Sequence, residues 1–133
     1  MIKDRFKSRV WQESSKHMGY DNCFIVYPDG STDMQLHRQD GSITLLRGEH
    51  GFTLMQCIGL KDKDGKLIYE KDILEDINFP KKYYKVVFDN DTCQHKFLQI
   101  KDNYQLITTS KKYCENYLKV IGNIYENKEL LEE

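Results

Sequence analysis

The sequence predicts a mainly β fold, and three observations support that prediction. The dominant hydrophobic period along the chain is two. Short strand-like runs alternate with turn residues at regular spacing, and only 2 prolines occur in 133 residues. No long stretch has the period of an amphipathic helix, and alternating β–α units are absent, which argues against a nucleotide-binding parallel sheet. We therefore expect an all-β barrel or a pair of packed sheets.

The first fifty residues are predicted to be strands joined by hairpins. Residues 5–11 alternate apolar and basic side chains, so we expect a strand with one apolar and one basic face. The apolar run 23–27 ends at a turn over 28–31, and residues 32–36 form the return strand. Asp40-Gly41 marks a second turn before a strand over 42–46.

The rest of the chain follows the same pattern more densely. Asp64-Gly65 is a strong hairpin signal, because glycine accepts a positive φ without Cβ strain. Asn127 is predicted to cap a terminal helical turn over 128–131, and residues 110–117 are a further helical candidate. The expected strands are 53–59, 67–69, 73–74, 83–88, 97–100, 106–109 and 118–125.

Composition and charge describe one soluble globular domain. The chain has 20 Lys+Arg against 21 Asp+Glu, a formal net charge of −1, which argues against a nucleic-acid binder that relies on bulk basicity. No stretch has the length and apolar character of a signal peptide or a membrane span, so we expect a cytoplasmic protein with no membrane partner. The 4 cysteines are too far apart to form a zinc knuckle, and we expect reduced, mostly buried thiols.

Motifs for catalysis and metal binding are weak. A calcium loop around Asp62–Gly65 would need acids at positions occupied by Leu60 and Lys71. Cys93 and His95 supply at most two of the four ligands that zinc requires. The sequence also lacks a nucleophile elbow and a phosphate-binding glycine loop. We therefore expect no catalytic residues, no metal, no cofactor and no enzymatic activity. An enzyme that uses Cys93 and His95 remains an alternative.

One basic and aromatic run favours nucleic acid. It comprises Lys81, Lys82, Tyr83, Tyr84 and Lys85. Single-strand binders combine cations that follow the phosphates with rings on which bases stack. The tyrosines fit a β core equally well, and an acidic bend and an acidic tail offset the local cations. Nucleic acid is therefore the second interpretation and is not favoured over a protein partner.

Two segments go beyond generic β patterning. Residues 54–74 resemble the signature of the YopX family of phage and prophage proteins, and residues 120–131 are similar to the closing segment of that family. Arg9-Val10-Trp11 is similar to its opening strand. Lys71 stands where the family commonly has glycine. From that substitution we expect a bend that does not require a positive φ.

The resemblance implies a mainly β architecture with an SH3-like barrel in the C-terminal half, β-hairpins packed on it and a short C-terminal helical turn. The expected division of this single domain is 1–52 for the hairpin region, 53–127 for the barrel and 128–133 for the tail. The resemblance also implies a phage or prophage origin, the bacterial cytoplasm and self-association, and it transfers no catalytic residues. The favoured interpretation is a non-enzymatic homo-oligomeric accessory protein that contacts phage or host proteins.

Overall fold

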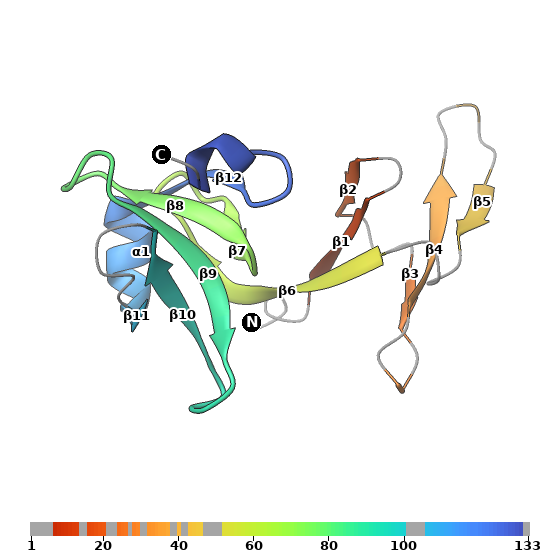
Figure 1. Ribbon diagram of the computed structural model, residues 1–133, viewed down its shortest axis with the longest axis horizontal. Helices are drawn as coiled ribbons and strands as arrows, with labels where there is room; N and C mark the ends of the chain where they lie inside the picture. The colour runs from red at the N-terminus through yellow and green to blue at the C-terminus, as the bar shows by residue number, and fades with distance from the viewer. Residues whose placement is uncertain are drawn as a thin grey trace. The chain divides into compact units, whose positions relative to one another are not determined.

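A computed structural model describes residues 7–13, 16–20, 24–26, 28–29, 32–37, 40, 43–46, 52–100 and 106–131. The chain divides into two compact units: Ser8–Met55, here called the N-terminal unit, and Met1–Lys7 with Gln56–Glu133, here called the C-terminal unit. Within these residues the elements are strands, one α-helix and a short 3-10 helix, and Figure 1 shows their arrangement. The predicted mainly β class is confirmed.

The N-terminal unit contains the first five strands and the beginning of the sixth. Within it, β1 lies between β2 and β6, and β4 lies between β3 and β5 in a separate three-stranded antiparallel sheet. The elements are β1 (Ser8–Gln12), β2 (His17–Gly19), β3 (Phe24–Val26), β4 (Thr32–His37), β5 (Ile43–Leu46) and β6 (Phe52–Lys61).

The first strand is buried on both faces, including the face that its alternation predicts to be basic. Arg9, Val10, Trp11 and Gln12 are all buried, with Arg9 only 1% exposed. Both faces of β1 are therefore covered, because neighbouring residues along a strand point to opposite faces. The Arg9 guanidinium donates to the Tyr20 hydroxyl at 3.2 Å and lies over the tyrosine ring.

The C-terminal unit is built on a curled five-stranded antiparallel sheet in the order β11-β10-β9-β8-β12 (Figure 1). Strand β7 pairs with β6 beside it. The remaining elements are β7 (Leu67–Tyr69), β8 (Asp72–Asp76), β9 (Tyr83–Asp89), β10 (Gln94–Gln99), β11 (Leu106–Ile107), α1 (Lys111–Tyr117), β12 (Leu118–Asn123) and a terminal 3-10 helix (Lys128–Leu131).

Alternation decides which side chains form the core. Tyr84 and Val86 of β9 point inward, as do Phe97 of β10 and Leu118 and Val120 of β12. Ile68, Leu74 and Cys114 complete this cluster. Each fully buried aliphatic or aromatic side chain contributes about 1.5–3 kcal/mol, so these inward-facing positions stabilise the unit.

The two predicted helical turns are present. Ser110 accepts a hydrogen bond from the N–H of Tyr113 and caps α1. The terminal 3-10 helix forms where expected, but the predicted capping role of Asn127 is wrong. Its side-chain oxygen accepts the N–H of Asn123 at 3.1 Å, while its backbone carbonyl accepts the N–H of Leu130. The Asn127 side chain therefore closes the preceding turn rather than the helix.

Candidate functional site

The carboxylate of Asp62 connects the β6–β7 turn to β12. Asp62 is 3% exposed. One of its oxygens accepts the N–H groups of Asp64 and Lys66 at 2.9 Å, and the other accepts the N–H of Val120, 58 residues away, also at 2.9 Å. Gly65 adopts a φ of 82°, so the predicted hairpin is confirmed. Asp62 is thus a structural residue, because both of its carboxylate oxygens accept hydrogen bonds from backbone N–H groups.

A second polar cluster closes β12. The Asn123 side-chain oxygen accepts the N–H groups of Tyr125 and Glu126 at 3.0 and 2.9 Å. A Cβ on Gly122 would lie 2.3 Å from the side-chain oxygen of Asn127, so any other residue would displace the Asn127 side chain from this turn. The closing segment that resembles the YopX family therefore also carries structural roles.

The bend between β7 and β8 corrects one expectation. Lys71 adopts a φ of 72°, so this position does require a left-handed conformation although it carries a side chain. Its N–H donates to the Val86 carbonyl at 2.9 Å and its own carbonyl accepts from Ile124 at 3.1 Å. These tertiary hydrogen bonds hold the strained conformation, which glycine would adopt without cost.

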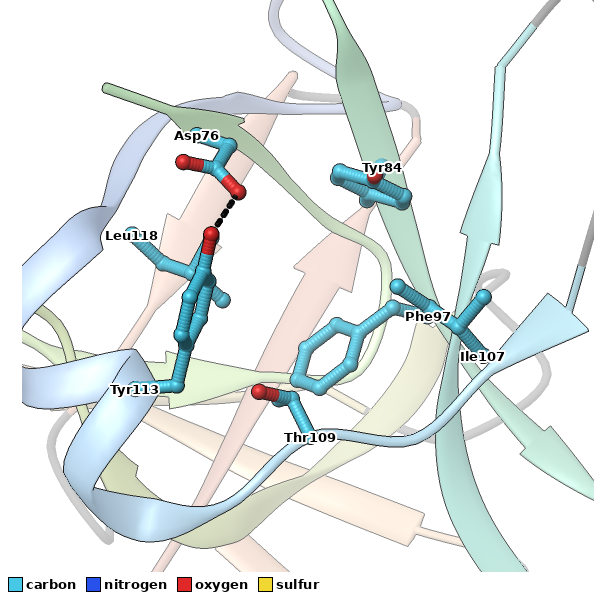
Figure 2. Close-up of a pocket in the computed structure, with 7 residues that line it drawn as sticks. All are labelled: Asp76, Tyr84, Phe97, Ile107, Thr109, Tyr113 and Leu118. Atoms are coloured by element: carbon cyan, nitrogen blue, oxygen red, sulfur yellow. Dashed lines mark hydrogen bonds between the residues drawn. The ribbon is translucent and has the colours of Figure 1, made fainter. Parts of the chain in front are cut away.

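A small pocket lies inside the C-terminal unit, between the sheet and α1 (Figure 2). The hydroxyl of Tyr113 points at Asp76 and donates a short hydrogen bond to it. That bond raises the pKa of Tyr113 above its ordinary value of 10.0. The cavity has about 20 Å³ of space, enough for roughly one water molecule rather than a substrate. Its lining consists of Asp76, Tyr84, Phe97, Ile107, Thr109, Tyr113 and Leu118.

Cys93 and His95 lie at the β9–β10 hairpin. Cys93 is exposed, so the expectation of a buried thiol is wrong at this position, while Cys57 and Cys114 are buried. Burial raises the pKa of the Cys114 thiol to about 11, which makes it a weak nucleophile at neutral pH. Cys23 lies outside the described residues.

The ring of His95 has a carboxylate partner. His95 Nε2 lies 2.9 Å from an oxygen of Glu70, and the Phe88 ring contacts the imidazole edge-on. The other Glu70 oxygen accepts the N–H of Gln56 at 2.8 Å. Across the described part of the chain, no three His, Cys, Asp or Glu side chains gather closely enough to hold a metal ion.

The five predicted nucleic-acid contacts are separated by the alternation of β9. Tyr84 is 6% exposed and lines the pocket, so its ring lies in the core. Lys81 is exposed, while Lys82, Tyr83 and Lys85 are half-buried. The structure therefore leaves the three lysines and Tyr83 at or near the surface.

Sequence reasoning missed the exposed apolar side chains beside these lysines. Ile77 is 46% exposed and Phe79 53% exposed, on the loop between β8 and β9, and Tyr117 at the end of α1 is 39% exposed. The Ile77 N–H donates to the Tyr117 carbonyl at 2.9 Å, which brings the two segments together. The available signal was Phe79-Pro80 between two strands, where a large ring has little sheet to pack against.

The chain belongs to the family described as YopX protein, whose model matches residues 7–132. It is similar in structure to the crystal structure of protein EF1440 from Enterococcus faecalis, with 24% identity, a TM-score of 0.66, and coverage of 95% of this chain and 97% of that one. The X-ray structure of protein yopX from Bacillus subtilis shares 23% identity and a TM-score of 0.60, with 96% of each chain covered. At these identities the likeness shows a shared fold. No curated protein matches the sequence.

Among the residues that the structure describes, no helix is both long and apolar enough to cross a bilayer.

Proposed function

We propose that this YopX-family protein is a non-enzymatic β module of phage or prophage origin that acts in the bacterial cytoplasm by self-association and by contact with phage or host proteins. Its C-terminal unit is an SH3-like barrel in this proposal. The supporting topology is four consecutive antiparallel strands, β8 to β11, followed by α1 and by β12, which returns to pair with β8. Small barrels of this kind serve many functions, so the function is inferred from the residues on the surface.

The exposed apolar side chains of the C-terminal unit are the observation that supports a protein-binding surface. Ile77, Phe79 and Tyr117 come from two neighbouring segments, and each exposes more than a third of its surface. Clustered exposed aromatic and aliphatic side chains are characteristic of protein interfaces. The polar residues of the two family-like segments, such as Asp62 and Asn123, bond to backbone groups and so support the fold.

Size-exclusion chromatography with light scattering tests the proposed self-association. We expect the full chain at micromolar concentration to have a mass above 15.8 kDa that falls on dilution. A single species at the monomer mass throughout this range would overturn the proposed self-association.

Single-stranded nucleic acid is the second candidate, and one contact favours it. Lys82 Nζ lies 5.2 Å from the centroid of the exposed Phe79 ring, which combines a cation with a stacking surface. Tyr83, with Lys81 and Lys85, would extend this surface along β9. This candidate assigns binding to Lys81, Lys82, Tyr83 and Lys85, with Tyr84 supporting them from the core.

Fluorescence anisotropy with a labelled twenty-nucleotide oligothymidine tests the second candidate. We expect binding at low salt that weakens steeply as salt rises and that falls when Lys82 is replaced by glutamate, because phosphate contacts release counterions. Tyr83→Ala should weaken binding further. Absence of binding at low salt, or binding that neither substitution changes, would rule this candidate out.

A further inference from the structure

The loop between β8 and β9 combines exposed apolar groups with positive charge. We call Ile77, Phe79, Lys81, Lys82 and Tyr117 the basic apolar patch. Lys82 Nζ lies over the Phe79 ring, and Lys81 is exposed. The backbone N–H of Lys81 donates to a carboxylate oxygen of Glu75 at 3.0 Å, which holds the residue at a φ of 69°. The lysines are therefore presented from an ordered turn.

The acidic group nearest to this patch in sequence is already engaged. Asp76 is 4% exposed and accepts the hydrogen bond from Tyr113, as well as the backbone N–H of Asn78 at 2.9 Å. Its charge is therefore directed inward. The loop residues that follow it, 77–82, include two lysines and no acid. The charged side chains of the loop itself are therefore two lysines, and half-buried Glu75, which accepts the Lys81 N–H, is the acid beside them.

The C-terminal segment of the same unit has the opposite character. Residues 126–133 contain four glutamates against one lysine, with two leucines among them. Glu129 is exposed on the terminal 3-10 helix, and Leu130 and Leu131 are half-buried beside it. This acidic apolar segment is complementary to the basic apolar patch in both charge and hydrophobicity.

The β8–β12 ladder separates the starting points of these two surfaces. Leu118 pairs with Asp76 at the end that leads into the patch, and Asn123 pairs with Asp72 at the end that leads into the C-terminal segment. Four residues of strand correspond to roughly 13 Å. Figure 1 shows the β8–β9 connection and the terminal helix departing from different ends of these strands. Two copies can therefore join the surface of one to the complementary surface of the other.

From this arrangement we infer that the chain associates head to tail, with the basic apolar patch of one copy binding the acidic C-terminal segment of a second copy. The occupant of the patch is thus residues 126–133 of another identical chain. Such a contact is heterologous, so it forms a ring if the rotation closes and a linear assembly if it does not. This inference rests on the proposed self-association and names the surface responsible for it.

Charge reversal followed by sedimentation velocity on the full chain tests the inference. Lys81→Glu with Lys82→Glu reverses the patch, and Glu129→Lys with Glu132→Lys reverses the C-terminal segment. Each pair should raise the dissociation constant for self-association at least about tenfold, because like charges then face each other. An equimolar mixture of the two double variants should associate again, since each retains one original surface. The chain carrying all four substitutions should associate within about threefold of the wild type.

Phe79→Ser and Phe88→Ser provide the matched apolar pair. Both rings are exposed, at 53% and 44%, but Phe79 lies on the loop before β9 and Phe88 lies near the far end of that strand. We expect only Phe79→Ser to weaken association. Far-UV circular dichroism verifies that each variant is folded. If a charge variant is unfolded, the comparison of the two phenylalanine variants tests the contact in its place.

The outcomes separate this inference from the broader proposal. A wild-type chain that self-associates, with variants that associate equally well, would overturn the head-to-tail contact and leave self-association standing. A monomeric wild type would overturn both. A monomeric wild type that binds oligothymidine through Lys81 and Lys82 would assign the patch to nucleic acid instead.

Discussion

Two hairpins of the C-terminal unit contain the same local turn, but the aspartate of each turn has different further hydrogen-bond partners. In both, an aspartate accepts the backbone N–H of the residue two positions later: Asp62 from Asp64, and Asp89 from Asp91. Asp62 is buried and also accepts the N–H of Val120 from β12. The carboxylate of Asp89 instead accepts from Thr92 and Lys96, within its own hairpin.

This difference shows that burial determines how much of the unit a turn stabilises. When the turn lies against another strand, its carboxylate satisfies the backbone of that strand and joins segments distant in sequence. When the turn is exposed, the same geometry stabilises a hairpin tip alone, and water can replace each bond. The family-like segment that includes residues 62–66 therefore supports the whole unit, whereas residues 89–93 support one hairpin.

The largest expected effect comes from Asp62→Ala. Removing this carboxylate leaves three backbone N–H groups without their acceptor, one of them in a buried strand. We expect a loss of about 3 kcal/mol in the free energy of unfolding. Urea denaturation followed by circular dichroism measures it. A loss as small as that of Asp89→Asn would contradict the distinction between the two hairpins.

Gly65→Ala should cost about 1 kcal/mol, because a side chain at a φ of 82° is strained. A Cβ at this position would have no heavy atom within 4 Å, so the backbone alone accounts for the loss. The same denaturation experiment measures it. A neutral substitution would show that the turn relaxes freely despite the buried Asp62 beside it.

Cys93→Gly should have the opposite sign. Cys93 adopts a φ of 55° in the second hairpin, where glycine carries no strain. We expect a gain of up to about 1 kcal/mol, reduced by the greater freedom of glycine in the unfolded chain. Differential scanning calorimetry of the two proteins under reducing conditions provides the comparison. A destabilised variant would indicate that the Cys93 side chain contributes more than its exposure suggests.

The smallest effect is expected for Asp89→Asn, and it should depend on pH. The hydrogen bond from Lys96 lowers the pKa of Asp89 below its ordinary value of 3.8. The stabilisation is therefore present above pH 3.8 and is lost as the pH falls through the folded-state pKa. Thermal melts of wild type and variant should differ slightly at pH 6 and converge as the pH falls below 3.8 and through the folded-state pKa of Asp89. A difference that persists at low pH would point to a cause other than this carboxylate.

Much of the C-terminal unit could be predicted, because its strands are marked by residue types at short spacing. The turn at Asp64-Gly65 and the strands that follow it depend on residue types at short spacing, and these appear as expected. The first strand could not be predicted in the same way. Arg9 belongs to the side of the strand that was expected to be basic, yet it is buried and contacts Tyr20, which no local pattern reveals.

The candidate surface was only partly predictable. The lysines at 81 and 82 were visible as a basic run next to Phe79-Pro80, yet no sequence signal placed Tyr117 beside this loop. Tyr84 illustrates the limit. Its neighbours suggest a stacking ring, but alternation along β9 directs it into the core.

The sequence by itself determined the β class, the hairpin turns and the family, because period-two patterning, glycine and aspartate chemistry and a long matching segment are local or linear properties. Only the tertiary structure decided that Asp62 bonds to β12, that Lys71 is held at positive φ and that the apolar groups of two segments meet beside two lysines. Those outcomes depend on which strands become neighbours. Pairing between distant strands is a property of the whole packed chain, since burial and the satisfaction of backbone groups are settled together when the sheet closes.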